Sequence, residues 1–248
     1  VTFRETTTGN PNLRPEKADS VSVGVVFQPT FLPGFSASVD GFDIKLKDAI
    51  GQFFAQDIIN RCFEGRTEFC AAYGPDPTGD RELFFRASPF NFARQWVRGI
   101  DFDASYRLPL ANIIQRAPGT VTLHGLATRY IHNITDSGVP NVIPVDTVGQ
   151  LSGISPPKWI YRFNASYETD SFSVAGTARG VSSGTYGNAY IVCDGNCPTG
   201  RPAATVSQFP TIDNNSISGV TYFDLNLTTK IETHSGGRAE LFLNVTNL

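Results

Sequence analysis

The chain has 248 residues, of which 40% are hydrophobic and only 17% are charged, and its formal net charge is −3 at pH 7. A net charge so close to zero does not favour a nucleic-acid partner, which selects for a basic surface. The sequence contains no apolar run of the roughly 18 residues that a transmembrane helix needs, although a membrane-crossing strand needs only about ten alternating residues.

Five stretches of the chain carry an apolar residue at every second position, beginning near Val21, Ile100, Trp159, Phe223 and Leu241. This period of two predicts strands with one apolar face and one polar face. After an irregular segment at 1–17, we expect strands at 18–29, 35–48, 83–109, 119–132, 157–168, 171–183, 217–231 and 237–248. We expect residues 52–63 to form one short helix, and we expect Pro89 to kink the third strand.

The connections between the predicted strands alternate between short and long, and the long ones cover 49–82, 133–156 and 184–216. Successive connections of antiparallel neighbours lie at opposite ends of a sheet, so all long loops are expected at one end. Long strands, this asymmetry, and aromatic residues near the ends of apolar faces are typical of a transmembrane antiparallel β-barrel with short periplasmic turns and long extracellular loops. A soluble β-sandwich is the alternative.

The four cysteines form two local pairs, Cys62 with Cys70 and Cys193 with Cys197, and each pair falls in a predicted loop. Four cysteines allow three connectivities, of which the two local pairs are the most economical. Neither pair has a histidine beside it, so we expect disulfides rather than a zinc site, with free thiols as the alternative. Disulfides would indicate an oxidising compartment.

No catalytic motif is found: the sequence lacks GxSxG, P-loop and HExxH patterns, and no catalytic residue, metal or cofactor is expected. Asp101 and Asp103 lie two apart on one strand face, and we interpret them as part of the polar wall of a water-filled lumen. Function is therefore expected in the long loops, where aromatic residues and arginine contact a ligand or pack within the loops. The candidate substrate-binding residues are Phe53, Phe54, Tyr73, Arg81, Phe90, Trp96, Tyr186 and Tyr190.

Six segments resemble TonB-dependent outer-membrane receptors. Gly9–Lys17 (GNPNLRPEK) is similar to the family's GNPxLKPEK segment, and Val39–Ile50 and Val97–Tyr106 are similar to two of its strands. The segments that begin at Pro157, Tyr222 and Leu241 match the family's closing strands in order. The resemblance extends from about residue 9 to residue 248, and the common order makes six individually weak motifs specific.

The resemblance implies a barrel of roughly 22 strands with a plugged lumen, to which this chain supplies about eight strands. Residues 1–248 would be the C-terminal portion of a single barrel domain, with the plug domain and the final strand outside this chain. It implies a place in the bacterial outer membrane, contact with its lipid, and TonB as a partner through the plug. The expected function is uptake of a scarce nutrient such as a siderophore, a cobalamin or an oligosaccharide. A secreted or surface adhesin without transport is the alternative.

Overall fold

The computed structural model describes residues 3–53, 55–63, 65, 67–136, 143–193, 211–232 and 237–248. The chain divides into two compact units, which are described separately. Unit 1 comprises Val1–Asp19, Lys45–Gln95 and Thr135–Pro144, and unit 2 comprises Ser20–Ile44, Trp96–Ile134 and Val145–Leu248. In the described part of the chain, no helix has the length and apolar composition needed to cross a bilayer.

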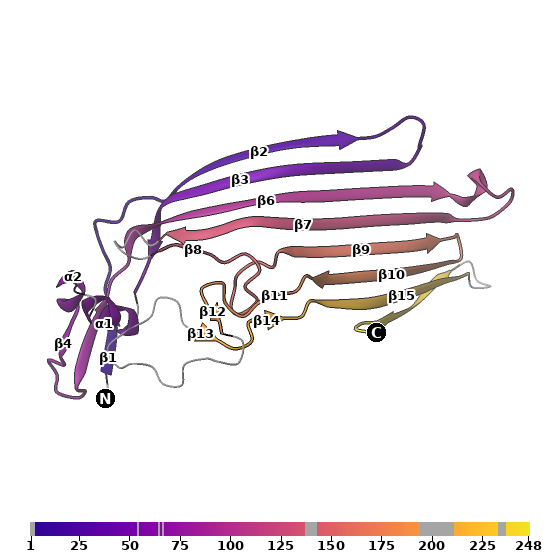
Figure 1. Ribbon diagram of the computed structural model, residues 1–248. Coiled ribbons are helices and arrows are strands. Elements are labelled where there is room, and N and C mark those ends of the chain that lie inside the picture. Colours follow the sequence, from indigo (N-terminus) through magenta and orange to yellow (C-terminus); the bar gives the residue numbers. More distant parts are fainter. Residues whose placement is uncertain are drawn as a thin grey trace. The chain divides into compact units, whose positions relative to one another are not determined.

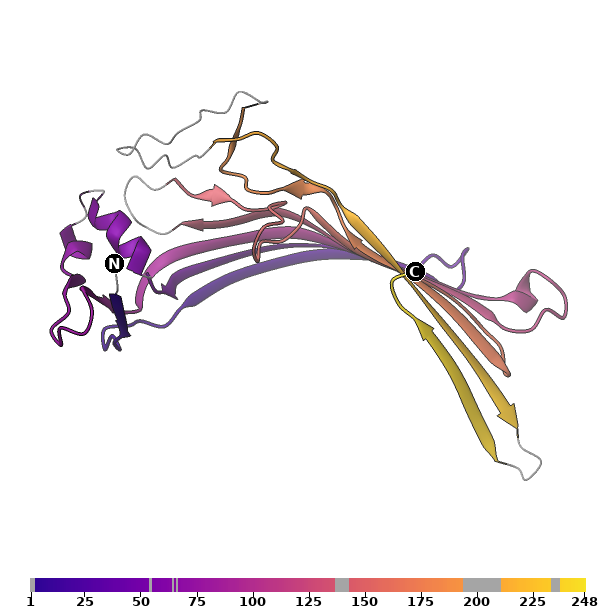
Figure 2. The ribbon, with the colours of Figure 1, turned by 90° about the horizontal axis from the view of Figure 1, so that it is seen from below.

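One large sheet contains all the long strands, whose side chains alternate between two faces as the sequence predicts. Its strands follow the order β16-β15-β10-β9-β7-β6-β3-β2, so neighbours in the sheet are successive long strands of the chain (Figure 1). The strand bounds are β2 (Lys17–Phe27), β3 (Phe35–Gly51), β6 (Phe90–Pro109), β7 (Thr120–Asp136), β9 (Trp159–Glu168), β10 (Phe172–Val181), β15 (Val220–Glu232) and β16 (Arg238–Val245). The all-β antiparallel architecture is confirmed, and the strands of unit 2 show the usual twist (Figure 2).

The connections confirm the predicted alternation of lengths. Residues 28–34, 110–119 and 169–171 form short connections at one end of the sheet, at the right in Figure 1, and 110–119 contains the 3-10 helix η1 (Leu110–Asn112). The connections at 52–89, 137–158 and 182–219 are much longer and leave from the opposite strand ends. We call the strand ends next to the long connections the outer ends.

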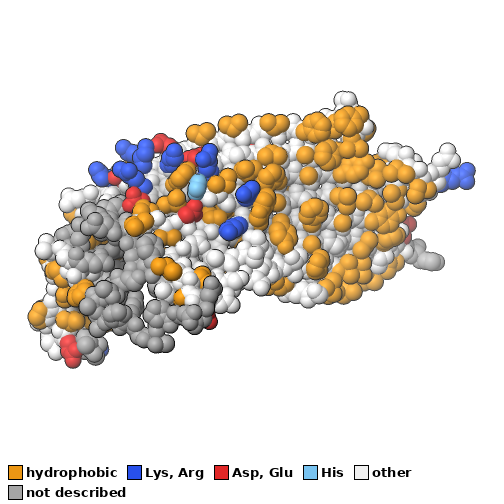
Figure 3. All heavy atoms as spheres, in the orientation of Figure 1, with side chains coloured by type: hydrophobic (Ala, Val, Ile, Leu, Met, Phe, Trp, Pro, Cys, Tyr) orange, Lys and Arg blue, Asp and Glu red, His pale blue; other side chains and the backbone are white. Residues whose placement is uncertain are grey.

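One face of the sheet in unit 2 is a broad apolar surface that the described residues do not cover. Val21, Val23 and Val25 on β2 are 63%, 72% and 69% exposed, and Phe163 and Leu243 are also exposed. Figure 3 shows hydrophobic side chains (orange) gathered over a broad area of one face of the molecule. An apolar surface of this extent is a lipid-facing surface in a strand-built membrane protein.

The other face of the sheet carries paired polar groups. His124 lies 3.3 Å from the carboxylate of Asp103, and the Thr128 hydroxyl donates to Asp101 at 2.6 Å. On β10, the Arg179 guanidinium donates to Asp224 of β15 at 2.9 Å. The acidic pair that we interpreted as part of a lumen wall therefore contacts side chains of the neighbouring strand β7. Because successive side chains of a strand point to opposite faces, these groups lie on the face opposite the apolar one.

Unit 1 contains a small sheet that the sequence does not predict. β1 (Phe3–Thr7), in the segment expected to be irregular, pairs in parallel with β5 (Leu83–Ala87), and β4 (Tyr73–Pro75) pairs with β5 on its other edge. The strand expected at 83–109 is therefore two strands in different sheets. Pro89 lies at the break, because its ring removes the backbone N–H that a continuous ladder needs.

Helix α1 (Ala55–Phe63) lies within the predicted helical range, and a second helix, α2 (Thr67–Cys70), follows it. The buried core of unit 1 contains Ala55, Ile58 and Phe85, and the last two are 2% and 1% exposed. The region expected to be one loop at 184–216 also contains short strands. β11 (Gly184–Thr185) pairs with β14 (Ser216–Ile217), and β12 (Ile191–Val192) pairs with β13 (Thr211–Ile212).

Candidate functional site

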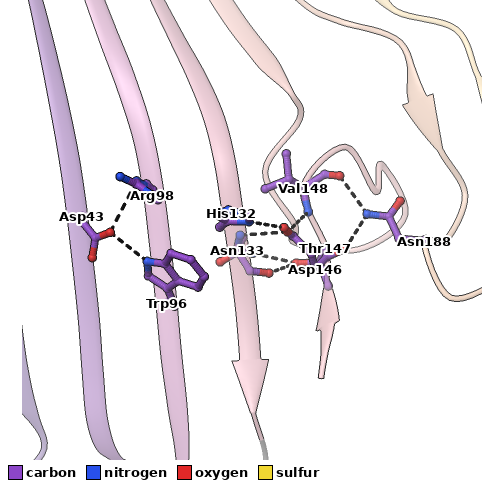
Figure 4. A network of polar contacts seen from close by, with 9 residues as sticks. All are labelled: Asp43, Trp96, Arg98, His132, Asn133, Asp146, Thr147, Val148 and Asn188. Carbon is purple, nitrogen blue, oxygen red and sulfur yellow. Dashed lines mark hydrogen bonds and ion pairs between the residues drawn. The ribbon is translucent and has the colours of Figure 1, made fainter. Parts of the chain in front are cut away.

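A polar network joins three strands at the outer end of unit 2 (Figure 4). The Trp96 indole N–H of β6 donates to Asp43 of β3 at 3.2 Å, and the Arg98 Nε lies 3.6 Å from the same carboxylate oxygen. The Trp96 ring stacks on His132 of β7, with ring centroids 4.4 Å apart. Trp96 is therefore fixed at its ring face and at its N–H group.

Asp146, in the short strand β8 (Val145–Asp146), anchors the connection between β7 and β9. Its Oδ1 accepts the backbone N–H groups of Asn133 at 3.0 Å and Val148 at 3.1 Å, and its Oδ2 lies 2.8 Å from His132 Nδ1. Burial raises the pKa of this carboxyl, but these hydrogen bonds to the charged form outweigh it and hold the pKa below its usual range. The charged form of Asp146 therefore fixes the loop to the end of β7.

Asn188 links the next long connection to this point. Its Nδ2 donates to the backbone carbonyls of Asp146 at 2.7 Å and Val148 at 2.8 Å (Figure 4), and its Oδ1 accepts the Thr185 hydroxyl at 2.5 Å. One side chain thus bridges the connection at 137–158 and the connection at 182–219. We call the chain from His132 through Asp146 to Asn188 the outer tether.

Two tyrosines lie next to the outer tether. The Tyr186 and Tyr190 rings have centroids 6.1 Å apart, and Tyr186 is 51% exposed. The Asn215 side chain accepts the N–H of Gly187 at 3.0 Å and donates to its carbonyl at 2.9 Å, which fixes the backbone between the tyrosines. Tyr190 is only half-buried, so both rings retain accessible surface, and an aromatic pair on a fixed backbone can stack against a ligand without a large ordering cost.

In unit 1, a disulfide joins Cys62 at the end of α1 to Cys70 at the end of α2. Tyr73 stacks on Phe85 with centroids 5.4 Å apart, and Phe53 packs on Phe69 at 5.0 Å. These two candidate ligand residues therefore contribute to the core of unit 1.

The adjacent loop of unit 1 is organised by Asp76. Its Oδ1 accepts the backbone N–H of Thr78 at 3.0 Å, and that bond lowers the pKa of the Asp76 carboxyl. Arg4 pairs with Asp80 at 3.3 Å and lies 3.9 Å from Asp76. Arg81, another candidate, is exposed beside this cluster.

Comparison with known families identifies the fold. The family model described as TonB dependent receptor-like, beta-barrel, matches residues 1–248. The chain belongs to this family. TonB-dependent receptor barrels lie in the outer membrane of Gram-negative bacteria, and so does this chain.

Solved TonB-dependent receptors share the fold at low sequence identity. A variant of the ferric enterobactin receptor PfeA from Pseudomonas aeruginosa is 13% identical, with a TM-score of 0.55 over 97% of this chain and 27% of that one. The FrpB iron transporter from Neisseria meningitidis, in its apoprotein form, is 13% identical, with a TM-score of 0.53 over 97% of this chain and 28% of that one. The chain therefore spans about a quarter of the length of these receptors. No curated protein matches it.

The other candidate residues and cysteines named from the sequence lie as follows in the structure. Phe54 and Cys197 lie outside the described residues, and Phe90 begins β6. Cys193 is disulfide-bonded. Asp146, Asn188 and Asn215 could not be predicted as site residues, because polar residues in loops are common and the partners of these three lie elsewhere in the chain.

Proposed function

We propose that this chain is part of a TonB-dependent receptor that captures a scarce nutrient outside the cell and admits it when TonB supplies energy. The observation that carries the proposal is the family match over all 248 residues. The long connections support it, because each leaves from an outer strand end and the Asn188 side chain joins two of them to each other. In this proposal the chain is the C-terminal portion of a single barrel domain, TonB acts through a plug outside it, and the chain has no enzymatic activity.

The ligand-contacting residues in this proposal are those that the fold leaves available. Tyr186 and Tyr190 present aromatic faces, and Arg81 presents an exposed guanidinium. Phe53 and Tyr73 instead pack against the core of unit 1 and would act by shaping its loops. A siderophore, a cobalamin or an oligosaccharide each offers surface that aromatic rings and arginine recognise. PfeA is a ferric enterobactin receptor and FrpB is an iron transporter, which favours an iron chelate as the first ligand to test.

The test is uptake by cells that carry the whole receptor gene. A strain that lacks the receptor is complemented with the wild type or with Tyr186→Ala/Tyr190→Ala, and uptake of labelled ferric siderophores, cobalamin and oligosaccharides is measured with and without TonB. We expect TonB-dependent uptake of one ligand by the wild type. The variant should reduce that uptake roughly tenfold, because the ligand can no longer stack on two aromatic rings.

Phe31→Ala is the matched control, because Phe31 is an exposed aromatic residue in the short connection 28–34 at the opposite strand ends. It should leave uptake unchanged. Ligand uptake that persists without TonB would contradict energy-coupled transport. Surface binding of a macromolecule with no uptake of any labelled nutrient would favour the adhesin alternative instead.

A further inference from the structure

The small sheet of unit 1 has one face toward its core and one face away from it. Side chains alternate along β5, so Phe85 points into the core while Phe84 and Arg86 share the other face. Phe84 lies directly opposite Gly74 of β4, and the backbone N–H of Arg86 donates to the Ala72 carbonyl at 2.8 Å. On this face, two large side chains of β5 therefore lie beside two of the smallest residues.

This difference in size leaves a cavity of about 240 Å³ beside β4, which we call the β4 hollow. A Cβ built on Gly74 would meet no atom within 4 Å. Pro75, Pro77 and Phe84 contribute apolar walls, and Arg86 is the one charged residue among the described residues that line the hollow. Sites for drug-sized ligands enclose roughly 300–1,000 Å³, so the β4 hollow suits a smaller molecule with a single ring.

The walls of the β4 hollow are fixed from the buried side. Asp76 lies between the two prolines, its side chain has no exposed surface, and its Oδ1 accepts the Thr78 N–H at 3.0 Å and the Thr78 hydroxyl at 2.9 Å. The segment that leads into β4 follows Cys70, which is disulfide-bonded to Cys62. A cavity with fixed walls can bind a small ligand without the cost of ordering a loop.

Arg86 supplies a positive charge that its surroundings do not neutralise. Its side chain is exposed and forms no ion pair within the part of the chain that the structure describes. Arg4, which lies opposite Phe84 on β1, is instead paired with Asp80 at 3.3 Å. A guanidinium group offers two parallel N–H donors that match the two oxygens of a carboxylate. The β4 hollow therefore combines apolar walls with one free anion-binding group.

We propose that the β4 hollow binds a small aromatic carboxylate. The ring of the ligand packs against Phe84 and the two prolines, and its carboxylate accepts hydrogen bonds from Arg86. A neutral aromatic molecule would leave the guanidinium without a partner, and an inorganic anion would leave the apolar walls uncovered, so the occupant carries both groups. The proposal uses residues of unit 1 alone and depends neither on TonB nor on uptake through the receptor.

The test is benzoate binding by the full-length receptor. The receptor is purified in detergent and titrated at pH 7 with benzoate, benzyl alcohol and cyclohexanecarboxylate, and the affinities are measured by ligand-observed NMR. We expect benzoate to bind most tightly, because benzyl alcohol lacks the charge and cyclohexanecarboxylate lacks the flat ring. Arg86→Gln should weaken benzoate binding roughly fivefold, since it removes an ion pair at an exposed position, and should leave the weak binding of benzyl alcohol unchanged.

Gly74→Val tests the place of the ligand, because its side chain fills the β4 hollow without meeting another atom at Cβ. This variant should lose benzoate binding. Gly9→Val is its matched control, since neither glycine has a positive φ and a Cβ at Gly9 also meets no atom within 4 Å. Arg94→Gln is the control for charge, because Arg94 is an exposed arginine of unit 1 that does not line the hollow. Both controls should bind benzoate as the wild type does.

Limited proteolysis that leaves unit 1 intact shows that each variant is folded. Equal benzoate affinities of the wild type and Arg86→Gln would overturn the proposal, as would unchanged binding by Gly74→Val. Benzyl alcohol or cyclohexanecarboxylate that binds as tightly as benzoate would overturn the assignment of the ligand class. The absence of saturable binding at millimolar benzoate would overturn it as well.

Discussion

Replacing Asp146 by alanine tests whether one carboxylate holds the outer tether. In the wild type, Asp146 Oδ1 accepts the backbone N–H groups of Asn133 and Val148 at 3.0 and 3.1 Å, and Oδ2 lies 2.8 Å from His132. Alanine removes all three contacts and leaves the two amide donors without their acceptor. The connection after β7 should therefore open more often, while the strands of the sheet stay paired.

The magnitude follows from the number of amide donors and from their exposure. A hydrogen bond to a charged group contributes roughly 1.5–3 kcal/mol when buried. The Asp146 side chain is 35% exposed, so water replaces part of each bond and about 1 kcal/mol per donor remains. Two donors give about 2 kcal/mol, which is a change of roughly thirtyfold in the opening equilibrium.

Hydrogen exchange of the full-length receptor, read by mass spectrometry, measures this opening directly. Peptides that contain the Asn133 and Val148 amides should exchange roughly thirtyfold faster in Asp146→Ala, and by a smaller factor in Asp146→Asn, which keeps one acceptor oxygen. Asp170→Ala, in the short connection 169–171, is the control and should leave these peptides unchanged. Wild-type exchange rates in Asp146→Ala would refute the tether.

The same carboxylate predicts a pH dependence. Hydrogen bonds from backbone N–H groups hold the folded-state pKa of Asp146 below the unfolded value of 3.8, despite the opposing effect of burial. Its stabilisation is therefore complete above the unfolded pKa and is lost as the pH falls through the folded pKa. Protection of the two amides, corrected for intrinsic exchange, should stay constant from about pH 7 to 5 and fall below about pH 4. A loss between pH 7 and 5 would contradict this assignment.

Three further substitutions test local structure. Cys62→Ser/Cys70→Ser opens a disulfide of sequence separation 8 and should destabilise unit 1 by about 2.5 kcal/mol, seen as faster limited proteolysis within 52–89. Gly34→Ala should lower the heat-modification midpoint of the barrel, because Gly34 has φ of 87° and a Cβ there would lie 2.2 Å from the Arg107 carbonyl oxygen. Asn188→Ala removes two bonds to backbone carbonyls and should accelerate exchange in 182–193 roughly fivefold or more.

Controls separate these effects from general instability. Gly153 has a positive φ of 85°, as Gly34 does, but a Cβ at position 153 would meet no atom within 4 Å. Gly153→Ala should therefore lower the heat-modification midpoint less than Gly34→Ala does. Reducing agent added to the wild type should reproduce the proteolysis of the double serine variant. Equal midpoints for the two glycine variants would show that the contact with Arg107 carries no cost.

The long strands could be predicted because their information is local. A side-chain period of two is visible in Trp159–Glu168 without knowledge of the rest of the fold, and it identifies the face that meets lipid. The pairing of β1 with β5 could not be predicted, because a short parallel pair is specified by contacts between distant segments rather than by local alternation. Phe53 and Tyr73 show a second limit, since an aromatic residue in a loop suits both a ligand surface and a small core.

The outer tether has a mechanical consequence. His132 belongs to a strand of the barrel wall, Asp146 to one long connection and Asn188 to the next. Tyr186 lies two residues before Asn188 in the same connection. A force that displaces the Tyr186 ring is therefore transmitted to the barrel wall through a few hydrogen bonds and is not dissipated in an untethered loop. A ligand that moves this part of the surface would also displace the end of β7.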